Sequence, residues 1–230
     1  MQICAVIPTY NEALNIEKLV RGLQAAVPGV RILVVDDNSP DGTAEVVRRI
    51  DGVDLLVRSG KLGFGTAYLD GFRRIAQSES PDAVLLMDGD LSHDPKAVPN
   101  MIEAIENADA VIGSRYAPGG RVEGWPLERR LLSAWGNRYV RAVTGMPMTD
   151  CTAGFMLLRV EVVRRLAAAP MEMAGYAFLM EVKHRIWRWG FRIREVPVVF
   201  RDRTAGKSKI SNSIVREGIV APWILRRREG

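Results

Sequence analysis

Residues 3–12 read Ile3-Cys-Ala-Val-Ile-Pro-Thr-Tyr-Asn-Glu12, a short apolar run that ends in a polar cluster. No polar residue alternates with the apolar ones inside the run, which is typical of a strand covered by helices on both faces. The pattern recurs along the first half of the chain and predicts strands at 3–8, 32–36, 53–57, 83–88 and 110–113. Stretches of helical periodicity lie near 12–27, 42–50, 65–76 and 95–107. This alternation predicts an α/β fold, a doubly wound, mostly parallel sheet with helices on both faces.

The second half of the chain follows a different order. It is predicted to contain a loop at 116–126, a helix at 127–143, a loop at 145–153, a strand at 155–159, a helix at 177–189 and an apolar run at 193–200. We expect this half to form a lid over the sheet rather than a second domain, so residues 1–211 are predicted to be one domain. Apolar residues at helical spacing in 214–228 predict that 212–230 form an amphipathic, basic helix.

The net charge of the chain is concentrated at one end. The formal charge is +5, and residues 201–230 account for all of it with eight Lys or Arg and three Asp or Glu. This distribution argues against a nucleic-acid-binding protein and for a local anionic partner, a phosphate group or a membrane surface, with a solvated basic C-terminus as the plain alternative. Two cysteines suit a reducing cytosol, and neither a signal peptide nor an apolar stretch of the roughly 20 residues that cross a bilayer is expected.

Two carboxylates follow the predicted strand at 83–88, in the segment Asp88-Gly-Asp-Leu-Ser-His93. Open α/β sheets bind ligands beyond the carboxyl ends of their strands, so this pair is expected at the ligand-binding edge. Asp88 and Asp90 would repel each other unless a cation lay between them, and oxygen ligands suit Mg²⁺ or Mn²⁺, which would also hold a diphosphate. The structural alternative is that both residues cap the helix that begins near Pro95.

Further segments at the same edge have both a structural and a functional interpretation. Residues 36–43, Asp36-Asp-Asn-Ser-Pro-Asp-Gly-Thr43, are typical of a turn with a helix N-cap, whereas Asp37 could accept hydrogen bonds from a nucleotide base. Tyr10 would stack on that base or fill the edge of the sheet. The loop Lys61-Leu-Gly-Phe-Gly-Thr-Ala67 is not a dinucleotide fingerprint, because Tyr68 replaces the third glycine and the loop follows the third strand instead of the first.

Seven ordered motifs make the chain resemble the family-2 glycosyltransferases of the GT-A fold, and among them the dolichol-phosphate (polyprenol-phosphate) mannose synthases. The motifs are residues 8–12, 35–43, 61–67, 88–93, Gly113-Ser-Arg-Tyr116, Asp150-Cys-Thr-Ala-Gly-Phe155 and Phe200-x-x-Arg203-x-x-Gly206-x-Ser-Lys209. The resemblance implies transfer of mannose from GDP-mannose to a polyprenyl phosphate, with Mg²⁺ or Mn²⁺ as cofactor. A glucosyltransferase or other sugar transferase that uses a UDP donor is the alternative within the family.

The resemblance also implies roles for residues of this sequence. The nucleoside would contact Pro8, Tyr10, Glu12, Val35 and Asp37. The metal and the diphosphate would be held by Asp88, Gly89 and Asp90, with Ser92 where relatives commonly carry a metal-ligating Gln. The donor or acceptor phosphates would be engaged by Arg115, Arg203 and Lys209, with Arg129, Arg130 and Ser133 near the acceptor phosphate. Asp150 would orient the sugar or the acceptor, and the predicted catalytic set is Asp90, Arg115, Asp150 and Arg203.

A lone His93 at the start of a helix could be a metal ligand, but a helix cap or a surface residue is the commoner outcome. A lipid monophosphate is anionic near neutral pH, so it would attack the anomeric carbon without a general base, and direct displacement would invert that carbon. A dehydrogenase or nucleotide-binding regulator should instead show a glycine-rich first turn, and a non-catalytic binding module should tolerate the loss of Asp88 and Asp90.

The lipid acceptor implies a peripheral protein on the cytoplasmic face of a membrane. The predicted helix at 212–230 would lie in the membrane interface through Val215, Ile219 and Trp223, with the arginines at 226–228 on anionic headgroups. The same face could instead dock on a membrane-anchoring partner subunit, or pack on its own domain.

Overall fold

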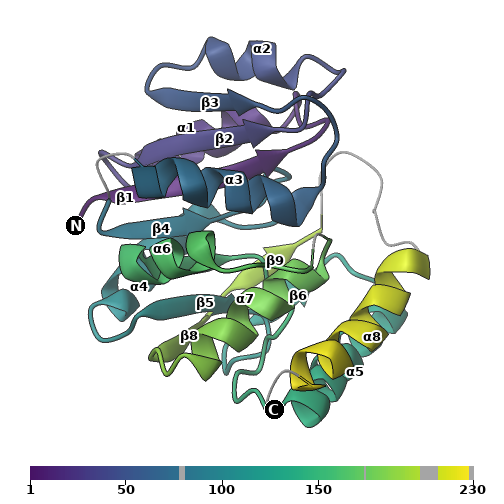
Figure 1. Ribbon diagram of the computed structural model, residues 1–230. Coiled ribbons are helices and arrows are strands. Elements are labelled where there is room, and N and C mark those ends of the chain that lie inside the picture. The colour runs from purple at the N-terminus through teal and green to yellow at the C-terminus, as the bar shows by residue number, and fades with distance from the viewer. Residues whose placement is uncertain (78–80, 174, 203–211, 228–230) are drawn as a thin grey trace.

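The computed structural model describes residues 1–77, 81–173, 175–202 and 212–227 (Figure 1). Seven strands form the main sheet: β1 (Ile3–Thr9), β2 (Arg31–Asp36), β3 (Val53–Val57), β4 (Ala83–Leu86), β5 (Ala110–Ser114), β7 (Met156–Arg159) and β8 (Ile193–Pro197). The helices are α1 (Ile16–Ala26), α2 (Thr43–Arg48), α3 (Phe64–Gln77), the 3-10 helix η1 (Pro95–Ala97), α4 (Val98–Ile105), α5 (Leu127–Thr144), α6 (Val160–Ala168), α7 (Ala177–Arg188) and α8 (Asn212–Arg227). The predicted alternation of strands and helices in the first half is confirmed.

The strand order of the main sheet is β3-β2-β1-β4-β7-β5-β8. All paired neighbours are parallel except β7, which runs antiparallel to both β4 and β5. The chain winds outward from β1 to β3 and then places β4 on the other side of β1, so the winding direction reverses between β1 and β4. The loops that leave two such strands diverge and open a crevice at the carboxyl edge, which is the usual ligand site of this architecture.

Helices cover both faces of the sheet because the strands are apolar on both sides. Side chains alternate along β1: Ile3, Ala5 and Ile7 pack in the core under α1, α2 and α4, whereas Cys4 and Val6 pack in the core under α3, α6 and α7. Full burial of a Val, Leu or Ile side chain contributes about 1.5–3 kcal/mol relative to exposure. The two cores therefore stabilise the sheet, and the sheet positions the polar loops at its carboxyl edge.

The second half contains three elements that the sequence did not predict. One is α6, and the others are β6 (Arg121–Glu123) and β9 (Val199–Arg201), which pair in a separate two-stranded sheet. The apolar run at 193–200 was predicted as one segment, but β8 ends at Pro197 and the chain then leaves the main sheet. Proline has no N–H to donate to a strand ladder, which suits the last position of β8.

The predicted C-terminal helix is α8, which lies beside α5 at the carboxyl edge of the sheet (Figure 1). It buries Ala221 and Leu225 against the domain, and Tyr139 of α5 donates a hydrogen bond to the carbonyl oxygen of Ile219 at 2.8 Å. The opposite side, which includes Trp223, is exposed. Within the described ranges, no helix combines the length and the apolar character needed to span a membrane.

Candidate active site

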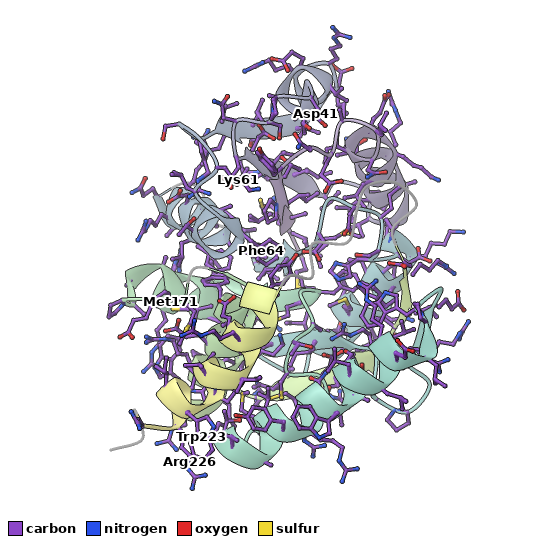
Figure 2. All side chains as sticks on the ribbon, turned by 90° about the vertical axis from the view of Figure 1, so that its right-hand side faces the viewer. Asp41, Lys61, Phe64, Met171, Trp223 and Arg226 are labelled. Carbon is purple, nitrogen blue, oxygen red and sulfur yellow. The ribbon has the colours of Figure 1, made fainter. Side chains whose placement is uncertain are left out.

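Two adjoining cavities open at the carboxyl edge of the sheet, the edge that faces the viewer in Figure 2. The N-terminal cavity, of about 230 Å³, is lined chiefly by the loops that follow β1, β2 and β3. The C-terminal cavity, of about 280 Å³, is lined chiefly by α5, α7, β9 and residues 152–154. Asp88, Asp90 and Tyr176 line both cavities. The carboxylate pair predicted from the sequence therefore lies at the boundary between two spaces of ligand size.

Residues 36–43 form a hydrogen-bonded turn beside the N-terminal cavity. The buried Asp36 accepts hydrogen bonds from Thr9 Oγ1 at 2.8 Å and from the backbone nitrogen of Ser39 at 2.8 Å. Asp41 accepts from the backbone nitrogen and the hydroxyl of Thr43. Burial would raise the pKa of Asp41, but these bonds hold it below its usual value. The turn is thus confirmed, whereas the N-cap position of α2 is Gly42, with no side-chain capping bond.

Asp37 is held by partners that the sequence did not reveal. Its Oδ1 accepts from Arg58 Nη1 at 2.5 Å, and its Oδ2 accepts from the backbone nitrogen of Gly63 at 2.9 Å. Arg58 is itself buried and donates from Nη2 to Thr66 Oγ1. A carboxylate oxygen accepts more than one hydrogen bond, so Asp37 lines the cavity with its orientation fixed and with capacity for a ligand. An arginine directly after the predicted strand at 53–57 was the available signal for Arg58.

Aromatic side chains complete the N-terminal cavity. Lys61 Nζ lies 4.2 Å from the centroid of the Tyr10 ring, and Phe64 stacks on Tyr176 with 5.6 Å between centroids. Figure 2 shows Lys61 and Phe64 at this edge. Pro8, Glu12 and Gly89, all predicted near the nucleoside or the diphosphate, also line this cavity. Val35 does not, because the alternation along β2 places its side chain in the core under α3.

The loop after β4 holds its carboxylates in a tight turn. Ser92 donates to Asp90 Oδ1 from its backbone nitrogen at 3.0 Å and from its hydroxyl at 2.5 Å. Leu91 has a φ of 63°, a left-handed backbone conformation that is uncommon for residues other than glycine. The surrounding structure must stabilise such a conformation, which is often found at ligand-binding sites. A Cβ on Gly89 would come 3.2 Å from Thr9 Cγ2, so the loop passes close to β1. Ser92, the predicted third metal ligand, thus supports Asp90.

The helical segment that follows is capped by neither member of the carboxylate pair. Asp94 caps it, because its Oδ1 accepts from the backbone nitrogen of Lys96 at 3.0 Å. The structural alternative for Asp88 and Asp90 is therefore wrong. Asp94 also forms an ion pair with Arg201 of β9 at 2.7 Å, which ties this loop to the two-stranded sheet.

His93 is buried, so the expectation of a cap or a surface residue is wrong. Its ring stacks on Phe155 with centroids 4.8 Å apart, and its Nδ1 accepts a hydrogen bond from the backbone nitrogen of Asp88 at 3.1 Å. Burial lowers the pKa of His93 to about 4, although the nearby Asp90 carboxylate opposes the shift. The ring is therefore neutral near pH 7.

Arg115 lines the C-terminal cavity and forms a buried ion pair with Asp150, which itself lines neither cavity. Arg115 Nε donates to Asp150 Oδ2 and Nη2 donates to Asp150 Oδ1, both at 2.8 Å. Burial would raise the pKa of Asp150, but Arg115 holds it down at about 2. The structure brings these two predicted residues together, and Asp150 orients Arg115 with both of its oxygens.

The remaining predicted phosphate-binding residues divide into two groups. Arg129 and Ser133 line the C-terminal cavity, where the Arg129 guanidinium carbon lies 4.0 Å from the Trp125 ring centroid. Arg130, one position further along α5, is exposed and does not line the cavity. Arg203 and Lys209 lie outside the described residues.

Three polar residues that the sequence did not identify support the loop at 149–154. Glu195 accepts from the backbone nitrogens of Thr149 and Asp150, and Asn137 Oδ1 accepts from the backbone nitrogen of Cys151 at 2.8 Å. Lys183 Nζ donates to the carbonyl oxygen of Ala153 at 2.5 Å. Burial lowers the pKa of Lys183 to about 8, with Asp150 opposing that shift. These contacts fix the loop that carries Asp150.

The carboxylate pair fits a divalent cation that is shared with a diphosphate. Across the described ranges, no group of three or more His, Cys, Asp and Glu side chains could hold a metal by itself. Mg²⁺ sites beside substrate phosphates commonly need only one or two carboxylates, with phosphate oxygens and water as the other ligands. Asp88 and Asp90 supply such oxygens, and the Asp88 side chain is 24% exposed at the cavity boundary.

Comparison with known sequences finds a matching family model and relatives that align with nearly the whole chain. The model of the family described as Glycosyl transferase family 2 matches residues 4–167. An undecaprenyl-phosphate mannosyltransferase from Micrococcus luteus is 40% identical, over 96% of this chain and 92% of that protein. A polyprenol monophosphomannose synthase from Mycolicibacterium smegmatis is 39% identical, over 97% of this chain and 87% of that protein. A dolichol-phosphate mannosyltransferase from Pyrococcus furiosus is 35% identical, and this chain spans 65% of it.

Comparison with solved structures supports the fold. Glucosyl-3-phosphoglycerate synthase from Mycobacterium tuberculosis in complex with UDP superposes with a TM-score of 0.71 at 19% identity, over 98% of this chain and 79% of that one. The same enzyme with Mn²⁺, UDP and glucosyl-3-phosphoglycerate gives a TM-score of 0.68 at 21% identity, with the same coverage. The predicted GT-A fold is confirmed by this likeness.

Proposed function

The chain belongs to glycosyl transferase family 2 and is a glycosyltransferase, and from that premise we propose that it transfers mannose from GDP-mannose to a polyprenyl phosphate. The proposal includes inversion, so that an α-linked donor yields a β-linked mannolipid. The observation that carries it is the pair of cavities of different character that meet at Asp88 and Asp90. The names of the two relatives from Micrococcus luteus and Mycolicibacterium smegmatis support the sugar and the lipid class.

The N-terminal cavity suits the nucleotide part of the donor. Tyr10 offers a ring for stacking on a base, and Lys61 beside it offers positive charge for phosphate oxygens. The oriented Asp37 carboxylate is a hydrogen-bond acceptor. A guanine edge presents neighbouring N–H donors to such a carboxylate, whereas uracil presents a single ring N–H between two carbonyl acceptors. This difference supports GDP over UDP as the donor.

The C-terminal cavity suits the phosphorylated end of a lipid. Its apolar lining consists of Trp125, Leu132, Leu179, Met180, Val198 and Phe200. Arg129, whose Nη1 forms a partly exposed ion pair with Asp202 at 3.3 Å, and Ser133 add a guanidinium and a hydroxyl to the same wall. Within the described part of the chain, the buried Nε of Arg129 and Nε1 of Trp125 have no hydrogen-bond partner, a shortage that an anionic ligand would relieve.

The acceptor needs no general base, because a phosphate monoester is already anionic near neutral pH. One of its oxygens forms a bond to the anomeric carbon while the bond from that carbon to the diphosphate breaks, and the electron pair leaves with GDP. The protein contributes orientation and charge. Asp150 accepts hydrogen bonds from Nε and Nη2 of Arg115. Arg115 therefore supplies a positive charge of fixed position at the cavity wall, rather than a guanidinium whose N–H groups are all available to a ligand.

Asp88 and Asp90 would hold Mg²⁺ or Mn²⁺ together with the donor diphosphate, with Ser92 orienting Asp90. The cation would supply charge stabilisation for the departing diphosphate.

We place the protein at a membrane surface through an exposed apolar stripe shared by α5 and α8. The stripe consists of Leu127, Leu131, Trp135, Ile219 and Trp223. Side-chain contacts join the two helices along this stripe, because Trp135 stacks on Tyr139 and the Tyr139 hydroxyl accepts a hydrogen bond from Trp223 Nε1 at 2.7 Å. Exposed arginines flank the stripe at 130, 138, 141, 216, 226 and 227, and Figure 2 shows Trp223 and Arg226 near one end of α8. Apolar and aromatic residues flanked by arginine are typical of a helix lying in the interface of an anionic membrane.

The Val215 side chain and Arg228, which belonged to the predicted anchor, lie outside the described part.

The proposal is tested by transfer of radiolabelled sugar to a short polyprenyl phosphate from GDP-mannose and, separately, from UDP-glucose, with Mg²⁺, Mn²⁺ or chelator. We expect chelator-sensitive mannolipid from GDP-mannose and cleavage of that product by a β-mannosidase. Turnover of UDP-glucose alone would replace the donor, resistance to chelator would remove the metal, and an α-linked product would refute inversion.

A further inference from the structure

His93 makes two approaches to Asp88 from one ring. Its Nδ1 accepts the hydrogen bond of the Asp88 backbone nitrogen at 3.1 Å. An imidazole nitrogen that accepts a hydrogen bond carries no proton, so the proton of the neutral ring is on Nε2. Nε2 lies 3.9 Å from Asp88 Oδ2, and both residues line the C-terminal cavity. The ring therefore holds the backbone of Asp88 through Nδ1, and its Nε2 lies near the Asp88 carboxylate but beyond hydrogen-bond distance.

The ring of His93 is itself held in place. It stacks on Phe155 with an interplanar angle of 10°, and the edge of Phe200 contacts it with 5.7 Å between centroids. Phe155 has little freedom, because a Cβ on Gly113 would come 2.7 Å from Phe155 Cδ1. Rotation of the imidazole would require these packed side chains to move.

The other side of the Asp88 carboxylate meets the loop at 152–154. A Cβ on Gly154 would lie 3.3 Å from Asp88 Oδ1, a tight contact that would require the carboxylate to shift by a few tenths of an ångström. Asp88 is thus close to both the His93 ring and the backbone of Gly154, with its carboxylate at the boundary of the two cavities.

We propose that His93 is a positioning residue that fixes Asp88 for binding of the divalent cation, chiefly through the hydrogen bond from the Asp88 backbone nitrogen to Nδ1. The inference rests on the proposed metal role of Asp88. Groups that orient ligating side chains commonly change metal affinity about 10- to 100-fold when they are replaced. The same range is expected here for loss of the Nδ1 acceptor.

Two nearly matched variants separate this role from packing. His93→Asn places a side-chain oxygen near the position of Nδ1, whereas His93→Gln places its amide near Nε2, and both remove the aromatic ring. His93→Phe keeps the ring and removes both nitrogens. The measurement is Mn²⁺ affinity in the presence of GDP, from the electron paramagnetic resonance signal of free Mn²⁺, with thermal unfolding recorded alongside.

We expect His93→Asn to bind Mn²⁺ within about threefold of the wild type, and His93→Gln and His93→Phe to bind it about 10- to 100-fold more weakly. Equal affinities for the Asn and Gln variants, or wild-type affinity for His93→Phe, would overturn the inference. If the polar variants do not fold, His93→Phe against the wild type still decides. Failure of the wild type itself to bind Mn²⁺ with GDP would contradict the metal role of Asp88, which is a separate result.

Discussion

The N-terminal cavity and the C-terminal cavity share Asp88 and Asp90 but are built in different ways. The first is made of the short turns that follow neighbouring parallel strands, where Asp36, Asp37 and Asp41 are each held by hydrogen bonds from within a turn or from the adjoining strand. The second is made of pieces far apart in the sequence, with α5, the loop at 149–154 and β9 brought together. Polar turns suit a nucleotide, and an aromatic and apolar lining with one buried ion pair suits a lipid phosphate.

Asp88 and Asp90 therefore lie at the junction of two walls that are supported independently. Substitutions of Asp88 or Asp90 should impair binding of both the donor and the acceptor. Substitutions in the wall of one cavity should impair binding of one of them.

The largest effect is expected at the boundary. Asp90→Ala removes a carboxylate that faces both cavities, so we expect transfer to fall on the order of a thousandfold or more while the fold is retained. Asp94→Ala is the matched control on the same loop, because Asp94 caps η1 and lines neither cavity. It should retain turnover close to that of the wild type and lose about 0.5–2 kcal/mol of unfolding free energy for the cap and about 0–1 kcal/mol for its exposed ion pair with Arg201. Wild-type turnover in Asp90→Ala, measured with circular dichroism as the check on folding, would refute the shared role.

The next effect concerns the scaffold of the C-terminal cavity. Asp150→Ala leaves Arg115 buried without its partner, which should cost about 3–5 kcal/mol of unfolding free energy by urea denaturation. Glu17→Ala breaks an exposed pair with Arg21 and should cost about 0–1 kcal/mol. Equal losses in the two variants would mean that the buried pair does not support this cavity.

The same pair predicts how stability depends on pH. Arg115 holds the folded pKa of Asp150 at about 2, although burial opposes it, and an unfolded Asp titrates near 3.9. Because the folded pKa is the lower one, the stabilisation is complete above about pH 4 and is lost as pH falls through about 2. Its size is roughly 2–3 kcal/mol, and Asp150→Asn should flatten the stability curve in that window. An unchanged curve would assign the acid sensitivity to other carboxylates.

Two adjacent arginines on α5 test whether the acceptor phosphate lies in the C-terminal cavity. Arg129 lines the C-terminal cavity and Arg130 is exposed. Arg129→Ala should raise KM for polyprenyl phosphate about 10- to 100-fold, because a hydrogen bond to a charged group contributes about 1.5–3 kcal/mol. Arg130→Ala should leave that KM nearly unchanged in detergent. The reverse order would move the acceptor phosphate to the outer face of α5.

The smallest effect is expected on the outer stripe. Leu131→Ser removes an apolar side chain that is 61% exposed, and it should reduce binding to phosphatidylglycerol vesicles by about tenfold or less, as loss of a few interfacial CH₂ groups implies. Leu14→Ser alters a leucine that is 86% exposed outside the stripe, and it should not change vesicle binding. Equal binding by all three proteins in a co-sedimentation assay would favour a partner subunit over lipid as the occupant of this face.

The sequence predicted the N-terminal half well because the information there is local. Apolar runs, helical periodicity and turn residues lie within a few positions of one another, and β1 to β5 and α1 to α4 follow that prediction. Even there, local reasoning did not find the ion pair of Asp37 with Arg58, whose members are separated by 21 positions and meet only when β2 and β3 pair.

The C-terminal half was predicted less completely because its contacts are long-range. Whether the Arg115 guanidinium is available to a ligand depends on its ion pair with Asp150. The burial of His93 depends on Phe155 and Phe200, which belong to other strands or loops. The strand β9 exists only because β6 pairs with it. Helical phase on α5 would have separated Arg129 from Arg130, but only once the face that meets the cavity was known.

The central claim is that one cavity holds the donor, the other holds the acceptor, and Asp88 and Asp90 join them. A crossed kinetic measurement tests it most directly: KM for GDP-mannose and KM for polyprenyl phosphate, each determined for the wild type, Tyr10→Ala and Arg129→Ala. We expect Tyr10→Ala to raise only the KM for GDP-mannose and Arg129→Ala to raise only the KM for the lipid. A rise in the KM for the lipid with Tyr10→Ala, or in the KM for GDP-mannose with Arg129→Ala, would contradict the division of the site.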